Sequence, residues 1–315
     1  MIEVNGKIIK TGVFPNKETY ADLDNNIVSS IDRSDEVNVL MKFQDNNDLM
    51  NLRFIKDYID GAIGNTVKIN LVMPYIPYSR MDRKENDRIF TLKSVADFIN
   101  GMNFNSVEVW EPHSDVSVAL LNRVRVVNKS RMIALNSIME ELGLTGSAWL
   151  CDTVHGVGDE FCLNGLFRKA DEAGIWLIYP DAGAEKRYTK QIKYPNYLSC
   201  SKERDFDTGR IKRLNLNIPE GINKETFKTA IIVDDLCSKG GTFLKTAEEL
   251  RKAGFSRVVL VVTHCEDIAF EYELFKCGLI DKVVTTDSIQ TKVRNDSCKD
   301  FGTCTLQVIK NSNWG

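Results

Sequence analysis

The sequence predicts an α/β protein of two domains, each built on a mostly parallel sheet with helices on both faces. Two observations support this expectation. The chain has 315 residues, which is too long for one small core and suits two domains of ordinary size. Short, continuously apolar runs alternate with stretches of helical periodicity in both halves, and strands buried on both faces of a parallel sheet have such runs. The expected domains are residues 1–130 and 131–315.

The individual elements follow from this alternation. Continuous apolar runs predict strands, and amphipathic stretches predict helices. In the first half, strands are expected at residues 37–43, 67–73 and 107–110, with helices at 48–63 and 92–102. In the second half, helices are expected at residues 131–142 and 242–253, with strands at 175–178, 229–233 and 258–263. Residues 202–213 are rich in charge and predict a long mobile loop, either a surface excursion or an active-site lid.

The composition argues against several classes of protein. A net charge of −3 produces no field that would attract nucleic acid. The longest apolar run, at residues 258–262, is far too short to span a membrane. The eight cysteines form no Cys-x-x-Cys pair and only three histidines accompany them, which favours reduced cytosolic thiols over a zinc site. The N-terminus lacks the shape of a signal peptide, and a cytoplasmic protein is expected.

One segment of the second half has the features of a sugar-phosphate site. The strand at residues 229–233 is followed by Asp234 and Asp235, and then by a loop of small residues that leads into a helix. Ligands of open α/β sheets bind beyond the carboxyl ends of the strands. Gly240 and Gly241 allow the backbone to approach a ligand closely, and amides of the loop and the helix start favour an anion.

The two aspartates must have a different task from the loop, because they would repel a bare phosphate. They suit the hydroxyl groups of a sugar, or a metal ion, beside the phosphate, while the hydroxyls of Ser238 and Thr242 add donors for the phosphate itself. The alternative is an ordinary strand-to-helix turn with capping residues. Adjacent aspartates at the end of a buried strand are costly without a partner, so the sequence favours a site for a phosphorylated ribose.

A second segment, residues 74–88, combines aromatic and basic side chains after the expected strand at residues 67–73. It contains Tyr75, Tyr78, Arg80, Arg83, Lys84 and Arg88. This mixture suits a triphosphate and a purine ring. On composition alone, a solvated charged loop is the better explanation.

Both segments resemble motifs of known enzymes. Residues 234–242 are similar to the motif that binds 5-phosphoribosyl 1-diphosphate (PRPP) in phosphoribosyltransferases and PRPP synthetases. Residues 74–84 resemble Pro-Tyr-x-x-Tyr-Ala-Arg-Gln-Asp-Arg-Lys of ribose-phosphate pyrophosphokinase, also called PRPP synthetase, and residues 90–97 resemble the family's next motif. Plain phosphoribosyltransferases lack this segment. The resemblance spans roughly residues 12–290 and implies two phosphoribosyltransferase-like domains.

Further matches follow in the family's order. Residues 14–19 resemble Phe-x-Asn-x-Glu-Thr, residues 47–50 resemble Asn-Asp-Asn-Leu-Met, and residues 179–187 resemble Ser-Pro-Asp-Ala-Gly-Gly-x-Lys-Arg. Residues 201–204 resemble the Lys-x-Arg of the family's catalytic flexible loop. Residues 111–115 stand where the family has Asp-Leu-His-Ala-x-Gln. A single histidine is more often structural than a ligand, so a role for His113 depends on the resemblance, and His155 and His264 are interpreted as structural.

The resemblance implies an activity and a role for each matched residue. The reaction transfers the β,γ-diphosphoryl group of ATP to the C1 hydroxyl of ribose 5-phosphate, giving PRPP and AMP, with Mg²⁺. The implied catalytic residues are Lys202 and Arg204, and the implied metal residues are His113 and Asp181. ATP binding is implied for Asn16, Glu18, Arg80, Met81 and Asp82. Ribose 5-phosphate binding is implied for Asp234, Asp235, Ser238, Lys239, Gly240, Gly241 and Thr242. A homo-oligomer, a dimer or higher, is implied as well.

The chain departs from the family pattern in several places. Its start is short, without the usual opening strand and Gly-Ser-Ser loop before Phe14. Met81 replaces a glutamine, Lys239 replaces a threonine, and residues 145–165 form an insertion without a motif. Two rival functions stay open. A phosphoribosyltransferase that consumes PRPP would not need residues 80–84 or 202–204, and a non-catalytic regulator on the same scaffold would tend to lose the lid or metal residues.

Overall fold

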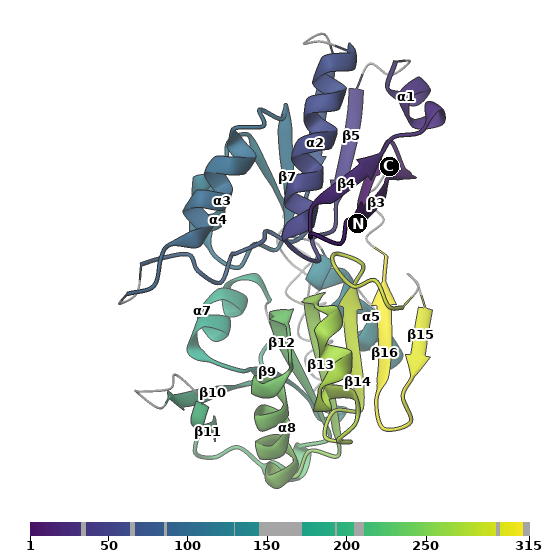
Figure 1. Ribbon diagram of the computed structural model, residues 1–315. Coiled ribbons are helices and arrows are strands. Elements are labelled where there is room, and N and C mark those ends of the chain that lie inside the picture. Colours follow the sequence, from purple (N-terminus) through teal and green to yellow (C-terminus); the bar gives the residue numbers. More distant parts are fainter. Residues whose placement is uncertain are drawn as a thin grey trace, which may run out of the picture. The chain divides into compact units, whose positions relative to one another are not determined.

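The computed structural model describes residues 1–32, 36–63, 67–84, 87–128, 130–144, 172–192, 194–204, 211–293 and 297–310. The expected insertion at residues 145–165 lies outside these residues. The chain divides into two units, Met1–Lys129 and Ser130–Gly315, and each contains a sheet flanked by helices (Figure 1). Across the described ranges, no helix is long and apolar enough to cross a membrane.

Unit 1 contains a six-stranded sheet in the order β2-β1-β5-β6-β7-β8. Its strands are β1 (Ile2–Val4), β2 (Lys7–Ile8), β5 (Glu36–Met41), β6 (Lys68–Val72), β7 (Ser106–Trp110) and β8 (Val124–Val127). Strands β5 to β8 are parallel, whereas β1 is antiparallel to β5. The expectation that the chain lacks an opening strand was therefore wrong, because β1 completes this sheet beside β5.

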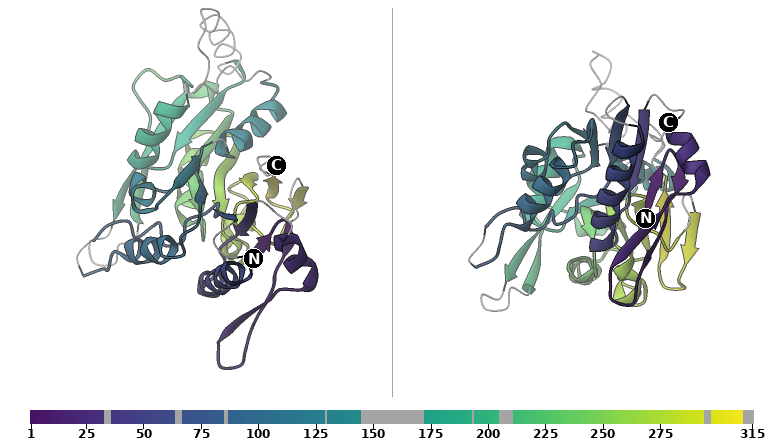
Figure 2. Two further views of the ribbon diagram at one scale, coloured as in Figure 1. Left: turned by 90° about the horizontal axis from the view of Figure 1, so that it is seen from above. Right: turned by 45° about the horizontal axis from the view of Figure 1, so that its top comes forward.

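Among the described residues of unit 1, the remaining elements are four helices and a separate hairpin. The helices are α1 (Asn25–Asp32), α2 (Asn46–Ile63), α3 (Thr91–Asn100) and α4 (Asp115–Leu120), and the hairpin consists of β3 (Lys10–Val13) and β4 (Thr19–Asp22). Helix and sheet side chains share one apolar cluster, in which Val39 and Leu71 of the sheet meet Leu52 and Ala96 of the helices. The β3–β4 hairpin projects from the rest of unit 1 (Figure 2).

Unit 2 contains an eight-stranded sheet in the order β11-β10-β9-β12-β13-β14-β16-β15. Its strands are β9 (Ile175–Tyr179), β10 (Tyr197–Arg204), β11 (Ile211–Asn217), β12 (Thr229–Cys237), β13 (Arg257–Cys265), β14 (Lys282–Thr286), β15 (Ser297–Asp300) and β16 (Thr305–Ile309). All neighbouring strands are parallel except the pairs β10–β11 and β15–β16.

Helices cover both faces of this second sheet, because its central strands are apolar on both sides. The helices are α5 (Ser130–Glu141), α7 (Ala182–Gln191) and α8 (Gly241–Ala253), with 3₁₀ turns at Lys224–Thr226, Asp267–Glu271 and Glu273–Phe275. In β12, Ile231 and Val233 belong to the apolar cluster that contains α5 and α7 side chains. Ala230 and Ile232 belong to the cluster that contains α8 side chains. Successive residues thus face opposite layers.

The strand order of unit 2 creates a switch point between β9 and β12. From β9, the chain passes through α7 to β10 on one side, whereas from β12 it passes through α8 to β13 on the other side. The connections that follow these two strands therefore diverge at the carboxyl edge of the sheet. Such an edge is where open α/β sheets bind their ligands.

Two parts of unit 2 differ from the sequence-based expectations. Lys202 and Arg204 lie in β10, and residues 211–213 lie in β11, so these parts of the expected loop are strand; residues 205–210 are outside the described range. Leu198 and Cys200 are buried and alternate with more exposed residues. This period of two is typical of a strand, but the many charged residues from 202 onward favoured a loop. Strand β12 continues to Cys237 rather than ending at Val233, because Leu236 and Cys237 pair with His264 and Cys265 of β13.

Candidate active site at the switch point of unit 2

Lys202 and Asp181 form an ion pair beside the switch point. Lys202 Nζ lies 2.6 Å from Asp181 Oδ2. The amide of Ala184 donates to Asp181 Oδ1 at 2.9 Å, so Asp181 also caps the N-terminus of α7. Burial alone would raise the pKa of Asp181, but the hydrogen bond from Lys202, the Ala184 amide and the Lys202 charge lower it. A predicted catalytic residue and a predicted metal residue are therefore direct partners.

The strand alternation explains how Lys202 reaches this position. Leu198, Cys200 and Lys202 are two residues apart along β10, so they point to the same face of the sheet. Leu198 and Cys200 are buried in the cluster that contains α8 side chains. The buried pair fixes the register of the strand, and Lys202 extends from its last part.

Asp235 and Arg187 form a second pair at the same edge. Asp235 is only 5% exposed, and its Oδ2 lies 3.3 Å from Arg187 Nη1 of α7. The sequence assigns Arg187 no role beyond its place in the motif at residues 179–187. Its position in α7 follows from the Asp181 cap, which starts the helix and directs Arg187 toward the end of β12.

Asp234 carries the least compensated charge of the cluster. Its Oδ1 accepts a hydrogen bond from the Asp235 amide at 2.9 Å. Burial raises the pKa of Asp234 well above the ordinary value, and the carboxylates of Asp235 and Asp181 raise it further. Three carboxylates thus lie near two cations, Lys202 and Arg187, which leaves a surplus of negative charge. Carboxylate oxygens in this setting can accept hydrogen bonds from sugar hydroxyls or attract a cation.

The turn at residues 238–242 runs from the end of β12 into the first residues of α8 and requires glycine. Gly240 has a φ of 81°, and a Cβ added there would lie 2.8 Å from Leu274 Cδ1. A side chain is therefore excluded on both conformational and steric grounds. A Cβ on Gly241 would meet no atom within 4 Å, so the backbone at the start of α8 borders open space. The first amides of α8 favour an anion in this space.

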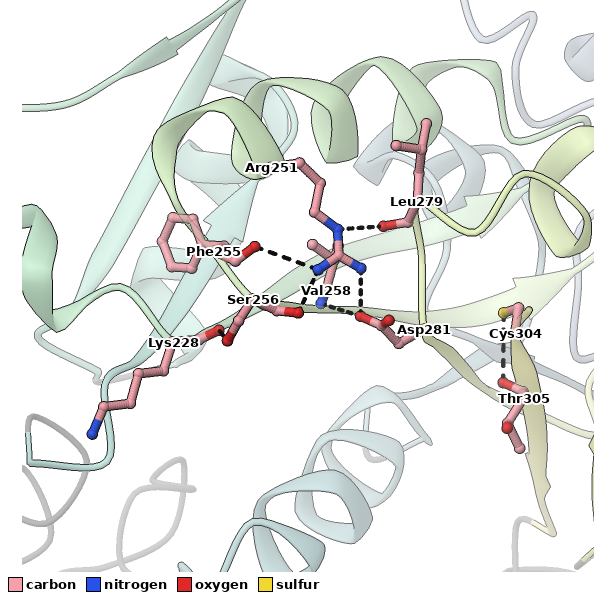
Figure 3. A network of polar contacts seen from close by, with 9 residues as sticks. All are labelled: Lys228, Arg251, Phe255, Ser256, Val258, Leu279, Asp281, Cys304 and Thr305. Atoms are coloured by element: carbon pink, nitrogen blue, oxygen red, sulfur yellow. Dashed lines mark hydrogen bonds and ion pairs between the residues drawn. The ribbon is translucent and has the colours of Figure 1, made fainter. Parts of the chain in front are cut away.

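The far end of α8 is fixed by a network around Arg251 (Figure 3). The Arg251 guanidinium donates to the Leu279 carbonyl at 3.2 Å and to Asp281 Oδ2 at 2.7 Å. It also donates to the carbonyls of Phe255 and Ser256, and Asp281 accepts from the Val258 amide. The helix is thereby attached to the start of β13 and the segment before β14, which holds its N-terminus at the 238–242 turn.

In unit 1, predicted ATP and metal residues meet at the carboxyl ends of β6 and β7. Arg80 is exposed and Met81 is half-buried, whereas Asp82 is only 6% exposed and accepts from Arg83 Nε at 2.9 Å. Burial alone would raise the pKa of Asp82, but the Ser114 hydroxyl, the Arg83 guanidinium and the His113 imidazole lower it. Asp82 is therefore a buried carboxylate that interacts with Arg83, Ser114 and His113 at this edge.

The segment that carries His113 begins with an unusual backbone conformation. Glu111 follows β7 directly, has a φ of 41° and is buried. Such a conformation is uncommon for a residue other than glycine and often occurs at functional sites. It turns the chain so that half-buried His113 lies within electrostatic reach of Asp82.

Asn16 and Glu18 lie apart from this edge, in the turn of the β3–β4 hairpin. Both are exposed, and Asn16 Oδ1 accepts a hydrogen bond from the Glu18 amide at 3.2 Å. The turn is closed by hydrogen bonds between the backbones of Phe14, Lys17 and Glu18. The predicted adenine-binding residues are thus presented at the end of a projecting hairpin.

The residues at the switch point fit a magnesium ion chemically. Asp181, Asp234 and Asp235 supply the hard oxygen ligands that Mg²⁺ prefers, and the raised pKa of Asp234 marks a surplus negative charge that a cation would offset. Considering only residues with described positions, no group of three His, Cys, Asp or Glu is arranged to hold a metal by itself. Mg²⁺ commonly binds through one or two carboxylates, waters and substrate phosphates, so a complete protein cage is not required.

Comparison with known proteins places these features in a family context. Residues 2–102 match the model of the N-terminal domain of ribose phosphate pyrophosphokinase, and residues 220–312 match that of the phosphoribosyl synthetase-associated domain. The ribose-phosphate pyrophosphokinase of Sulfurisphaera tokodaii is 25% identical over 283 residues, which cover 88% of this chain and 83% of that protein. Its counterpart from Campylobacter jejuni is 25% identical over 248 residues, which cover 78% of this chain and 69% of that protein.

A solved structure has the same fold. The phosphoribosylpyrophosphate synthetase from Mycobacterium smegmatis matches with a TM-score of 0.66 and 20% identity, over 96% of this chain and 86% of that chain. This likeness confirms the predicted fold class, an α/β protein with two mostly parallel sheets flanked by helices.

Proposed function

Because the chain is a distant member of the ribose-phosphate pyrophosphokinase family, we propose that it is a ribose-phosphate diphosphokinase. It would transfer the β,γ-diphosphoryl group of ATP to the C1 hydroxyl of ribose 5-phosphate, giving PRPP and AMP. The observation that carries this proposal is the cluster at the switch point of unit 2. There, Lys202, Asp181, Asp235 and Arg187 are paired beside the glycine turn at residues 238–242.

In this proposal, different residues of the cluster bind different parts of ribose 5-phosphate. Asp234 and Asp235 accept hydrogen bonds from the ribose hydroxyls, and the amides and hydroxyls of residues 238–242 bind the 5-phosphate. These contacts fix the sugar, so that its C1 hydroxyl is oriented for in-line attack on the β-phosphorus of ATP. Such positioning, together with stabilisation of phosphate charge, accounts for most of the catalysis in phosphoryl transfer.

Lys202 has two partners in this proposal. Without substrate, its ammonium neutralises Asp181 at 2.6 Å. When the phosphates of ATP are present, the same ammonium stabilises the negative charge that develops on their oxygens. Mg²⁺ held by Asp181 and the substrate phosphates would supply additional charge neutralisation. Within unit 1, His113 is the residue proposed for a metal. Arg80, Met81, Asp82, Asn16 and Glu18 would bind ATP.

A direct assay tests the proposal. The chain is incubated with ATP, ribose 5-phosphate and Mg²⁺, and AMP and PRPP are quantified by chromatography. Equal amounts of both products are expected, and neither should form when ribose 5-phosphate is omitted. Loss of added PRPP in the presence of a nucleobase, without AMP formation, would instead indicate a phosphoribosyltransferase.

A binding experiment tests the assignment of the sugar site. Asp235→Asn is expected to weaken binding of ribose 5-phosphate more than binding of ATP, as measured by calorimetry. Glu220→Gln, an exposed substitution in the same unit, serves as the matched control. A variant that lost ATP affinity but kept its affinity for ribose 5-phosphate would contradict the assignment.

One observation favours a second candidate, a non-catalytic member of the family that regulates a partner enzyme. The pair between Lys202 and Asp181 occupies a residue proposed for catalysis and one proposed for the metal. A chain that keeps this pair closed would bind ribose 5-phosphate without turning it over. Calorimetric binding of the sugar phosphate, combined with no AMP formation at any Mg²⁺ concentration, would support this candidate.

A further inference from the structure

We propose that Tyr272 is a positioning residue for the substrate phosphate, because its ring holds the ammonium group of Lys239 beside the turn at residues 238–242. The inference deepens the proposed function and rests on it. Lys239 Nζ lies 4.8 Å from the centre of the Tyr272 ring, within the range of a cation–π interaction. Lys239 stands where the family motif has a neutral threonine, so this contact is a feature of the present chain.

Tyr272 is well suited to hold a mobile side chain because its own segment is anchored. It lies between the 3₁₀ turns Asp267–Glu271 and Glu273–Phe275, and the neighbouring Leu274 and Phe275 are buried. The rings of Phe270 and Phe275 stack at 5.0 Å, and both contact Phe301. The amide of Tyr272 donates to the carbonyl of Ala269 at 3.3 Å, and the residue is 38% exposed, so its backbone is held while its side chain stays accessible.

The anchored segment also contacts the phosphate turn directly. Leu274 is the side chain that a Cβ on Gly240 would meet at 2.8 Å. The amide of Glu266 donates to the carbonyl of Cys237 at 2.8 Å, which joins the end of β13 to the residue before the turn. The turn at residues 238–242 therefore lies against the 266–275 segment, and Lys239 bridges from the turn to that segment.

The charge balance of the site explains why a held ammonium would matter. Asp234 and Asp235 lie in the last part of β12, a few residues before the turn, and their charge opposes binding of a phosphate. The charges of Lys202 and Arg187 are engaged with Asp181 and Asp235. Lys239 adds a cation on the phosphate side of the carboxylates. A lysine stem has many rotamers, and the Tyr272 ring confines the ammonium close to the turn before the ligand arrives.

Four variants and one double variant test the inference, using calorimetric titration of the full chain with ribose 5-phosphate. Lys239→Met removes the charge and keeps the length of the stem, and it is expected to weaken binding about tenfold. Tyr272→Leu removes the ring face, and a loss of about two- to fivefold is expected. Tyr272→Phe retains the aromatic ring face and should bind ribose 5-phosphate with wild-type affinity. Lys276→Met removes an exposed lysine from the same region and should have no effect.

The double variant separates positioning from general damage to the fold. If Tyr272 acts through Lys239, adding Tyr272→Leu to Lys239→Met produces no further loss of affinity, and both variants show a weaker salt dependence of binding. Fully additive losses, an equal loss in Tyr272→Phe, or unchanged affinity in Lys239→Met would each overturn the inference while the wild type still binds. A wild-type chain that does not bind ribose 5-phosphate would overturn the proposed function together with the inference.

Discussion

Replacing Asp234 with asparagine is expected to stabilise the folded chain at pH 8, although Asp234 belongs to the proposed site. Burial and the neighbouring carboxylates of Asp235 and Asp181 raise the pKa of Asp234 in the folded state. A carboxyl with a raised folded pKa opposes folding when it is ionised. This penalty is complete above the folded pKa, declines as the pH falls through it, and is absent below the unfolded value of about 3.9. Asparagine carries no charge at any of these pH values.

The magnitude follows from the charges at the switch point. At an effective dielectric constant of about 20, two like charges about 4 Å apart repel by roughly 4 kcal/mol. Lys202 and Arg187 compensate the two neighbouring carboxylates at 2.6 and 3.3 Å, so most of this repulsion is offset. A net gain of about 1–2 kcal/mol at pH 8 is expected for Asp234→Asn. The amide oxygen of asparagine can still accept the hydrogen bond from the Asp235 amide.

Urea unfolding of the chain without ligand measures this gain. Wild type, Asp234→Asn and the exposed control Glu220→Gln are compared at pH 8 and pH 4 by circular dichroism. The stability difference between Asp234→Asn and wild type should be positive at pH 8 and close to zero at pH 4, with no such trend in the control. A destabilised variant at pH 8, or a gain that is equally large at pH 4, would refute the reasoning.

Four further outcomes are expected. Lys202→Ala should reduce turnover severely while ribose 5-phosphate binding, measured by calorimetry, stays nearly intact; wild-type turnover would contradict its proposed role. Arg187→Met removes a half-exposed partner from a buried carboxylate, and denaturant unfolding should show a loss of about 1–3 kcal/mol. Arg251→Met should lower the thermal midpoint through a loss of about 1–3 kcal/mol, whereas the exposed Lys252→Met should not change it. Glu141 lies at the end of α5. Burial alone would raise its pKa, but its hydrogen bonds with Lys282 and Arg257 and their positive charges lower it. Glu141→Gln should therefore be less stable than wild type at pH 7. This difference should vanish as acid titration passes below the folded pKa.

The sequence predicted the central strands and helices well because their signal is local. The apolar runs near residues 37, 67, 107, 175, 229 and 258 all became parallel strands, since burial on both faces requires continuous apolar character. The prediction was wrong for residues 202–204 and 211–213, which belong to the β10–β11 hairpin at one edge of the sheet although nearly all of them are charged. Such strands have one polar face, and charge content alone makes them look like a loop.

For the candidate site, the sequence determined which residue types are available and at which strand ends they stand. It placed Asp181 after β9, and Asp234 and Asp235 near the end of β12, and the resemblance assigned their roles. It also identified Gly240, whose positive φ and contact with Leu274 account for the glycine. The family and the fold class predicted in this way were both confirmed.

The tertiary structure alone decided which of these groups became partners. Lys202 and Asp181 are 21 positions apart in the chain, and Arg187 and Asp235 are 48 positions apart. Lys239 reaches Tyr272 only because the 266–275 segment folds back on the phosphate turn. These contacts depend on the order of the strands and on the divergence of the chain at β9 and β12. That order is set by the packing of both faces of the sheet as a whole, which local periodicity does not encode.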